Sequence, residues 1–398
     1  MTERLFRDDP YLLEFDARIV GRRDHEGRPA VVLDRTAFYA ESGGQPWDLG
    51  SLGEAAVVAV LDDAGSILHV LDRPLPGDAV HGRVDAGRRR DHRQQHHGQH
   101  LLSRAFVELA DASRTTSFHL GAEVSTIDLD REVDEAMVRA AERRANEVVW
   151  EGRPVRVRVV SPAEAARLGV EPPEEAGDSV RLVDAEGFDL QACGGTHPRS
   201  TSEVGVVVVV GYERHKGGSR VRFVCGHRAL EVFHTRERLL RDLAATFSSA
   251  FEDLPAAGRR AVEALVEGER QRHDLLERAM EGEAHRLLAR SPERPAVVVA
   301  TYEGWPAAHL RLLAQKVVAV APSVALLGSR ADKVHVVFAQ SAGLGHDVPA
   351  LLRQAVATLG GRGGGKGDLA QGGGDRPHLL EDALQKAARA VRGDTSPA

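Results

Sequence analysis

The first ninety residues alternate short apolar runs with turn-forming residues. Glycine, aspartate and proline separate the runs, which is the pattern of short β-strands joined by turns. Strands this short and this closely spaced favour a small β-barrel over residues 1–90. The runs that predict them are Ala30–Leu33, Ala56–Leu61, Ile67–Leu71 and Val80–Val84.

Residues 91–230 mix helical and extended patterns. A helix is predicted through the histidine-rich stretch that follows His92, and a second helix runs from near Val133 to Trp150. Runs of β-branched residues between and after them indicate strands, so this segment is predicted to be an α+β domain. The predicted strands are Val155–Val160, Val204–Val210 and Val221–Cys225.

Residues 231–292 are charged, with apolar positions at helical spacing. Leu239, Leu243 and Phe247 recur before Pro255, and further leucines continue the pattern beyond it. This pattern predicts a helical hairpin or short coiled coil that links two domains. Most of its Glu and Arg residues are expected to be solvated.

Residues 293–398 return to buried-looking strands, Ala296–Ala300, Val324–Leu327 and Val334–Phe338, with helical stretches between them. This indicates an α/β domain. Its glycine tract, residues 360–367, resembles a phosphate-cradling loop but lacks the Gly-Lys-Ser/Thr ending of a P-loop. We favour contact with a nucleic acid backbone or self-association over nucleotide hydrolysis. The predicted fold class is therefore multidomain α+β, with a barrel, an α+β domain, a helical linker and a glycine-rich α/β domain.

Composition narrows the class of protein. The chain has 398 residues, 42% of them hydrophobic, which is enough for more than one core. No apolar run reaches the roughly 20 residues that cross a bilayer, and the segment from Met1 to Arg4 lacks the pattern of a signal peptide. We therefore expect a cytoplasmic protein without membrane association. Of two cysteines, Cys225 is expected to be a buried free thiol.

The formal net charge of -7 argues against nonspecific coating of nucleic acid. A local basic face remains open, because arginines cluster just before the histidine-rich helix. A solvated helix face is the alternative interpretation. The arginines are Arg83, Arg88, Arg89, Arg90 and Arg93.

Two short motifs carry candidate metal ligands. His96 and His100 are four residues apart, so on a helix both imidazoles point to one face while His97 points elsewhere. Cys193 and His197 flank a Gly-Gly-Thr segment that permits a tight turn of the backbone. Together these four side chains predict one zinc ion per chain.

The motifs also exclude one class of zinc enzyme. Gly98 and Gln99 stand between the two histidines, where a metalloprotease motif needs its glutamate. Peptide hydrolysis is therefore not expected. Because four protein ligands would close a tetrahedral site, we expect either displacement of one ligand, His197 rather than Cys193, or a rise in coordination number. His97 is a further titratable group near the metal and a competing candidate ligand.

A segment from Thr36 to Pro46 joins two barrel strands. Adjacent Gly43 and Gly44 let a backbone approach a ligand closely, and hydroxyl and amide side chains flank them. An ordinary hairpin turn is the alternative interpretation.

These motifs together resemble a known family. The two ligand motifs, and the Thr-x-Phe-Tyr-x-Glu-x-Gly-Gly-Gln segment from Thr36 to Gln45, are similar to the editing domain of alanyl-tRNA synthetase and to its freestanding relatives, the AlaX trans-editing proteins. The glycine-rich domain is similar to the C-terminal domain of those synthetases, which is related to the domain that accompanies DHH phosphoesterases. The order of domains resembles the long form of AlaX.

The resemblance implies a zinc-dependent hydrolase of an aminoacyl ester. Its expected partner is tRNA(Ala) mischarged with serine, or alternatively with glycine. The resemblance places Thr36 and Gln45 in a catalytic, hydroxyl-seeking pocket, Gly43 and Gly44 beside the aminoacyl-adenosine end, and Arg220 at a phosphate. Because the barrel starts near the N-terminus, no aminoacylation core is expected. A homodimer through the C-terminal domain is compatible with the resemblance.

The sequence leaves two other classes of protein open. One is a non-catalytic tRNA-binding protein with a structural zinc ion. The other is a phosphoesterase acting on short oligonucleotides, which only the final domain suggests. The Asp-His-His motif of that family is missing, because arginine follows Asp91 and His92.

Overall fold

The computed structural model describes residues 1–109, 113–173, 177–331 and 333–394. The chain forms two compact units, Met1–Leu243 and Ala244–Ala398, called unit 1 and unit 2 below. The predicted division into four domains is finer than this division into two units, and it stays a prediction. Within the described ranges, no helix combines the length and the apolar character needed to cross a membrane.

Unit 1 begins with a closed barrel of six strands in the order β2-β3-β7-β6-β5-β8. Its interior is apolar, with Leu33, Phe38, Leu52 and Leu71 fully buried. Burial alternates along β8, as expected for a strand with one face toward a core. The strands are β2 (Glu14–His25), β3 (Arg28–Leu33), β5 (Gly50–Leu52), β6 (Ala55–Asp63), β7 (Ser66–Leu71) and β8 (Ala79–Val84), beside a short pair, β1 (Glu3–Arg4) and β4 (Arg35–Thr36), and a 3-10 turn, η1 (Leu5–Arg7).

The rest of unit 1 packs helices against two antiparallel sheets, ordered β14-β15-β10-β9 and β11-β12-β13. The predicted strand Val204–Val210 is wrong at its start, because Val204 ends a 3-10 turn and Gly205 has a φ of 81°. The elements are α1 (Ala86–Leu109), β9 (Thr115–Leu120), β10 (Ser125–Leu129), α2 (Glu135–Glu151), β11 (Val155–Val160), α3 (Pro162–Arg167), β12 (Val180–Ala185), β13 (Asp189–Ala192), η2 (Thr201–Val204), β14 (Val207–His215), β15 (Gly218–Cys225) and α4 (His227–Phe247).

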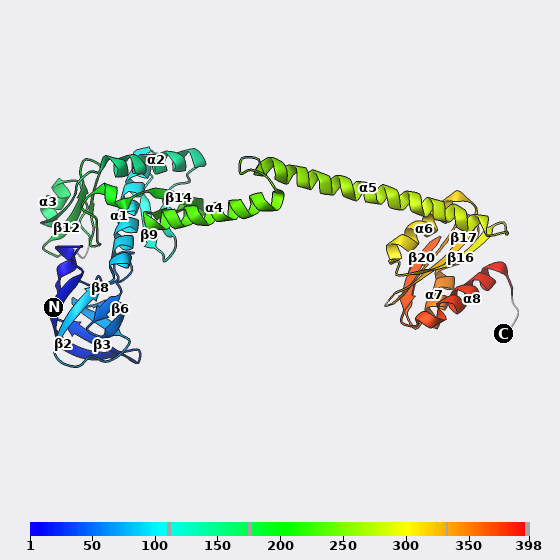
Figure 1. Ribbon diagram of the computed structural model, residues 1–398, viewed down its shortest axis with the longest axis horizontal. Coiled ribbons are helices and arrows are strands. Elements are labelled where there is room, and N and C mark those ends of the chain that lie inside the picture. Colours follow the sequence, from blue (N-terminus) through cyan, green and yellow to red (C-terminus); the bar gives the residue numbers. More distant parts are fainter. Residues whose placement is uncertain (110–112, 174–176, 332, 395–398) are drawn as a thin grey trace. The chain divides into compact units, whose positions relative to one another are not determined.

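Helix α1 is the central element of unit 1, and it leads from the barrel into the α+β layers (Figure 1). Its residues from Gln95 to Ser103 are all buried, although most of them are polar. Buried polar groups need hydrogen-bond partners, so this helix is not an ordinary core helix. Gly98 lets it approach β15 closely, since a Cβ there would lie 2.2 Å from Cys225 Sγ. Cys225 itself is a buried free thiol, as predicted.

Unit 2 is a five-stranded sheet, β16-β17-β18-β20-β19, with helices on both faces. In β17, Val324 and Leu326 face the core shared with α7 and α8, whereas Ala325 and Leu327 face the core shared with α5 and α6. The elements are α5 (Leu254–Ala289), β16 (Ala296–Glu303), α6 (Ala307–Val320), β17 (Ser323–Arg330), β18 (Val334–Gln340), α7 (Val348–Thr358), β19 (Arg362–Lys366), β20 (Leu369–Gly374), η3 (Pro377–Leu379) and α8 (Leu380–Arg392).

One resemblance in unit 2 needs correction. The glycine tract is a β-hairpin and not a phosphate-cradling loop, because β19 pairs with β20 from Arg362 to Lys366. One of its glycines has a packing reason, since a Cβ at Gly363 would lie 3.0 Å from Leu352 of α7. Helix α5 overlaps the predicted linker, residues 231–292, which stays a prediction. Met280 and Leu287 of α5 already belong to the core beneath the sheet.

Replacing Gly98 with alanine should destabilise unit 1 by roughly 1–3 kcal/mol, because the new methyl group overlaps Cys225 Sγ and the helix must shift. Urea denaturation followed by circular dichroism measures the change. Gly268→Ala is the matched control, since a Cβ there meets nothing within 4 Å and alanine favours helix by roughly 0.5–1 kcal/mol. Equal stability of Gly98→Ala and wild type would refute the close packing of α1 on β15.

Candidate functional site

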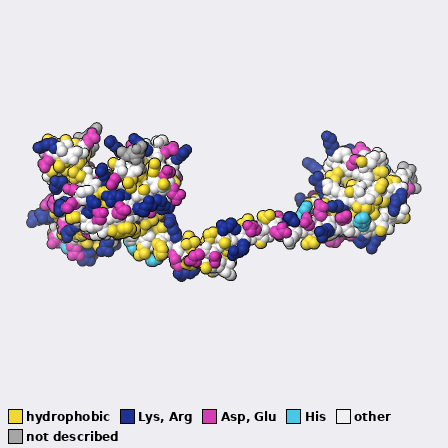
Figure 2. Space-filling view, turned by 90° about the horizontal axis from the view of Figure 1, so that it is seen from above, with side chains coloured by type: hydrophobic (Ala, Val, Ile, Leu, Met, Phe, Trp, Pro, Cys, Tyr) yellow, Lys and Arg dark blue, Asp and Glu magenta, His cyan; other side chains and the backbone are white. Residues whose placement is uncertain are grey.

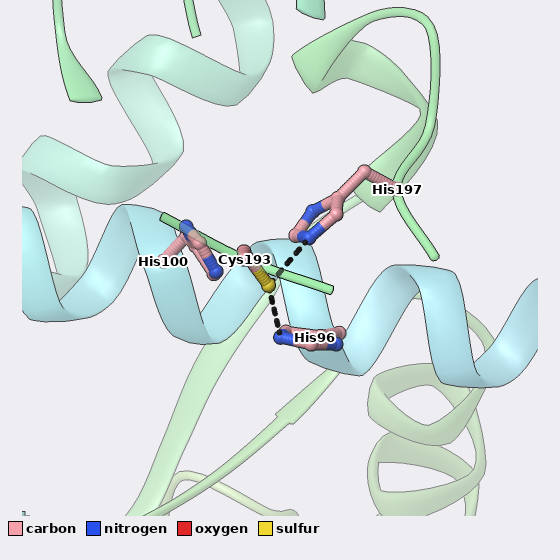
Figure 3. A group of neighbouring side chains, drawn as sticks. All are labelled: His96, His100, Cys193 and His197. Atoms are coloured by element: carbon pink, nitrogen blue, oxygen red, sulfur yellow. Dashed lines mark hydrogen bonds between the residues drawn. The ribbon is translucent and has the colours of Figure 1, made fainter. Parts of the chain in front are cut away.

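Four side chains from α1 and the loop after β13 converge on one point (Figure 3). One potential ligand atom from each of His96, His100, Cys193 and His197 lies within 4.8 Å of the others. The Cys193 sulfur is 3.4 Å from Nε2 of His96 and 3.2 Å from Nε2 of His197. The structure thus brings together residues almost a hundred positions apart in the chain.

Each histidine is held by a partner on its other ring nitrogen. Nδ1 of His96 is 2.7 Å from the Gln45 side-chain oxygen, and Nδ1 of His100 is 3.0 Å from Asp189. These partners leave the Nε2 atoms free to face the shared point. Such orienting hydrogen bonds are typical of histidines that bind metal ions.

His97 is the orienting partner of the third ligand. Its Nδ1 lies 3.2 Å from Nδ1 of His197, and its ring is fully buried. If His197 keeps Nε2 unprotonated toward Cys193, its Nδ1–H donates to His97, whose own proton then sits on Nε2. That Nε2 atom has no hydrogen-bond partner among the described residues. His97 is therefore outside the group of four, and its predicted competition as a ligand has no support from its position.

Gly195 makes the approach of the two motifs sterically possible. A Cβ at this position would lie 2.1 Å from Cε1 of His96 and 2.9 Å from the Gln45 oxygen. The Gly195 nitrogen also donates to the Cys193 sulfur at 3.4 Å. The second glycine of the motif is thus required by close contact with the first motif.

The electrostatics suit a thiolate at Cys193 and a protonated His100, whose proton a bound ion would displace. Burial alone would raise the pKa of Cys193, but His96 and His197, with hydrogen bonds from His100 and His197, hold it well below the usual range of a thiol. Burial also opposes a charged His100, yet hydrogen bonds with Asp189 and Cys193 raise its pKa to about 10. Three imidazole nitrogens and one thiolate around a point form a donor set suited to tetrahedral zinc. These residues could hold such an ion.

The predicted hairpin around Gly43 and Gly44 is a tight turn. Ser42 and Gln45 exchange backbone hydrogen bonds, and both glycines have positive φ, 53° and 78°. A Cβ on Gly44 would lie 2.8 Å from the Phe118 ring. The turn therefore packs on β9, directs Gln45 to His96 and leaves Gly43 in the wall of a cavity.

That cavity, of about 650 Å³, lies beside the group of four. We call it the metal-side pocket. His96, His100 and Cys193 line it, whereas His197 does not. The hypothesis that His197 is the displaceable ligand therefore gains no support, because a molecule in the pocket meets the other three first. The remaining lining residues include Gly43, Gln99, Ser103, Arg104, Arg114, Thr115, Thr116, Ser117, Asp189 and Gln191.

No pattern in the sequence singled out Gln99 as a substrate contact, although it stands between the two histidine ligands. Its amide nitrogen donates to Ser103 at 2.9 Å, and Ser103 in turn contacts Thr115 at 2.6 Å. The Gln99 side-chain oxygen is buried without a partner among the described residues. An unpaired acceptor in a pocket beside a candidate metal site is a candidate substrate contact.

Thr36 is not brought to this pocket. Its hydroxyl lies 2.8 Å from Nε2 of His69 and accepts the Phe38 N–H at 3.1 Å, inside the barrel core. Gln45 likewise uses its amide within the protein, on His96 and on Thr196. In this arrangement Gln45 positions a ligand, and Thr36 holds the segment that carries Gln45.

Arg220 faces Asp128 rather than open solvent. Its Nε and a terminal nitrogen donate to the two carboxylate oxygens at 2.6 and 2.8 Å. This pairing lowers the pKa of Asp128 to about 2. A phosphate at Arg220 would compete with that carboxylate, so its predicted role stays a prediction.

The arginines before α1 do not form one basic face. Arg89 is fully buried against Asp48, and Arg93 is stacked 3.7 Å from the centre of the Tyr11 ring. Arg83 pairs with Glu14, and Arg88 donates to the Trp47 carbonyl. Arg90 alone among these five is exposed without an ion-pair or hydrogen-bond partner in the described part of the chain.

Two protein-family models match parts of this chain. The model of the "Threonyl and Alanyl tRNA synthetase second additional domain" matches residues 180–222, which include Cys193 and His197. The model of the DHHA1 domain matches residues 294–393 in unit 2. Together they define the class: a protein that combines an additional domain of threonyl- and alanyl-tRNA synthetases with a DHHA1 domain.

Individual relatives narrow this class. The alanyl-tRNA editing protein AlaX-L of Pyrococcus horikoshii is 32% identical over 387 residues, 94% of each chain. The alanine–tRNA ligase of Methanopyrus kandleri is 33% identical over 98% of this chain, which spans only 45% of that ligase. The crystal structure of the C-Ala domain from Aquifex aeolicus alanyl-tRNA synthetase aligns with 24% of this chain and 89% of its own, at 27% identity and a TM-score of 0.23. The chain belongs to the alanyl-tRNA editing protein family.

The buried contact between Thr36 and His69 gives a pH dependence. Burial lowers the pKa of His69 from 6.5 to about 4, so the folded barrel keeps this ring neutral. Unfolding exposes a ring that binds a proton below about pH 6.5, and the free energy of unfolding therefore falls as pH drops from there to about 4. His69→Gln should reduce that fall by about 3 kcal/mol.

Urea titrations between about pH 4 and pH 7 measure this effect. His25→Gln, in the same barrel, is the control for the substitution itself. If His69→Gln and His25→Gln lose stability equally on acidification, the buried neutral state of His69 is refuted.

Proposed function

We propose that this protein is a zinc-dependent deacylase that removes a wrong amino acid from tRNA(Ala) in trans. Seryl-tRNA(Ala) is its main substrate, and glycyl-tRNA(Ala), which offers no hydroxyl to the pocket, is a second and poorer one. The observation that carries the proposal is the convergence of His96, His100, Cys193 and His197 beside a cavity with an unpaired acceptor. Membership in the alanyl-tRNA editing family supports the choice of substrate.

The chemistry required is hydrolysis of an ester. A zinc ion held by these residues would supply a Lewis acid for the ester carbonyl once one ligand is displaced or its coordination expands. Gln45, Asp189 and His97 fix the ligand rings, so the site is ordered before substrate arrives. Gly43 has no side chain, so the pocket wall leaves room there for the aminoacyl-adenosine end. Arg104 and Arg114 line the same pocket and offer cationic groups for the phosphate of the terminal nucleotide.

Discrimination between serine and alanine rests on Gln99 in this proposal. The seryl hydroxyl can donate to the unpaired Gln99 oxygen, whereas an alanyl group leaves that oxygen buried and unsatisfied. A site built around a hydroxyl can reject the analogue that lacks it by a factor of roughly 10⁴. This is a different assignment from Thr36, whose hydroxyl is occupied inside the barrel.

The first test compares ester hydrolysis of seryl-tRNA(Ala), alanyl-tRNA(Ala) and seryl-tRNA(Ser) by zinc-loaded protein. Of these three substrates, we expect rapid hydrolysis of seryl-tRNA(Ala) only. The pocket should reject alanine because it lacks the hydroxyl, and the rest of the chain should reject tRNA(Ser). Chelation of zinc, or the Cys193→Ala His197→Ala double variant, should reduce the rate to the spontaneous rate. Zinc content measured by mass spectrometry shows whether the variant has lost the ion.

Other outcomes assign a different function. Zinc-loaded wild type that binds tRNA but hydrolyses none of the three esters would refute the deacylase and leave a tRNA-binding protein with a structural zinc ion. Full activity after complete removal of zinc would refute the role of the metal.

Replacing Gln99 with leucine tests the selectivity. The variant removes the unpaired oxygen, so hydrolysis of seryl-tRNA(Ala) should slow by roughly 10–100-fold in kcat/KM, while hydrolysis of alanyl-tRNA(Ala) should rise because no acceptor is left unsatisfied. Steady-state kinetics on both substrates give the ratio. Thr36→Val is the comparison variant, and a loss of selectivity there but not in Gln99→Leu would return the role to Thr36.

A further inference from the structure

A second cavity in unit 1 has no role in the reaction described above. It has a volume of about 860 Å³ and lies at the start of α1, between the segment around Trp47, the end of β9 and the start of α4. We call it the helix-start pocket. Pro46, Trp47 and Leu120 provide apolar lining, while Arg88, Arg90 and Arg228 provide guanidinium groups.

The charges in this pocket favour an anion. Arg228 is already neutralised, since its Nε donates to Asp91 at 2.7 Å. Arg88 uses its Nε on the Trp47 carbonyl but has further donors, and exposed Arg90 has no ion-pair or hydrogen-bond partner among the described residues. Glu41 is the remaining acidic side chain in the lining. Gly87, in the first turn of α1, brings the positive end of the helix dipole to the same place.

His92 is an independent sign of a ligand. Its side chain is only 2% exposed, it lines the pocket, and its Nδ1 has no hydrogen-bond partner within the described ranges. A buried polar atom without a partner costs roughly 1–3 kcal/mol. A hydroxyl or phosphate group of a bound molecule would satisfy it.

The two pockets are neighbours along three separate elements. On α1, His92 lines the helix-start pocket and His96, one turn later, lines the metal-side pocket. On β9, His119 lines the helix-start pocket and its neighbour Phe118 lines the metal-side pocket. The turn at residues 42–45 stands between them, because Glu41 and Pro46 line one pocket and Gly43 lines the other.

We propose that the helix-start pocket holds the nucleotide that precedes the aminoacylated terminal nucleotide of a single-stranded RNA end. This inference rests on the proposed function, since it assumes that the terminal nucleotide lies in the metal-side pocket. An apolar floor with arginines at its edge suits a base and its phosphate. Figure 2 shows acidic and basic side chains interspersed over the visible face, which is therefore not uniformly basic, and the formal net charge of -7 likewise favours local RNA sites of this kind.

The test uses the full chain and the exposed residue Arg90. A fluorescent RNA trinucleotide ending in adenosine is the binding probe, followed by anisotropy at several salt concentrations. Arg90→Glu should weaken binding about tenfold, and Arg90→Ala should lower the salt slope by about 0.7, as expected for loss of one phosphate contact. The matched control is Arg143→Glu, the same change at an exposed arginine of α2 that does not line the pocket.

Kinetics provide the second arm. Arg90→Glu should raise KM for seryl-tRNA(Ala) about tenfold with little change in kcat, and should leave hydrolysis of the seryl ester of free adenosine unchanged. A defect on the adenosine ester as well would overturn the assignment, because that substrate has no preceding nucleotide.

Three further results would overturn the proposal. Arg90→Glu could bind the trinucleotide as well as Arg143→Glu does. Adenosine monophosphate could displace the probe at the same concentration as an unlabelled trinucleotide, which would indicate a mononucleotide site. The wild type could also fail to bind the probe. If the wild type binds the trinucleotide through Arg90 but hydrolyses no ester, the RNA site stands and only the deacylase is refuted.

Discussion

A buried ion pair between Arg89 and Asp48 fixes the geometry on which the site depends. Both side chains are fully buried, and the guanidinium also donates to the Ala37 and Pro10 carbonyls. The pair joins the first turn of α1 to the segment that carries Gln45, and Gln45 in turn holds His96. Removing one member of such a pair costs roughly 3–5 kcal/mol, because the other charge stays buried. These contacts fix the position of the ligand helix relative to the barrel.

Helix α1 concentrates the remaining constraints. A helix with a buried run of glutamines and histidines is stable only if other elements supply partners, and the partners come from distant segments. Cys225 exchanges backbone hydrogen bonds with the Gln95 side chain, and Asp189 and Gln45 hold the ligand rings. Gln99 and His92 keep one unpaired atom each, and each lines a different pocket. Two of the unpaired buried atoms on α1 thus face the two cavities, whereas the unpaired atoms of His97 and Arg93 line neither.

Much of the fold was predictable, because local periodicity reports burial. All four predicted barrel strands lie within strands of the structure, and Val155–Val160 matches β11 at both ends. The ligand motifs were also readable, since four-residue spacing on a helix and a Gly-Gly turn are local properties. Val204 was assigned to a strand because valine favours strands, but Gly205 with its positive φ ends a 3-10 turn there. The glycine tract looked like a loop because nothing local reveals that α7 packs flat against it.

Residue types at fixed spacing were enough to identify the set of potential ligands, the order of elements and the kinship with alanyl-tRNA editing proteins. Which polar atoms are already in use depends on contacts that form only in the folded chain. Thr36 and Arg220 are occupied by His69 and Asp128, which lie 33 and 92 residues away along the chain. Whether a hydroxyl, amide or guanidinium is free to meet a substrate depends on partners across such distances, and no local pattern encodes them.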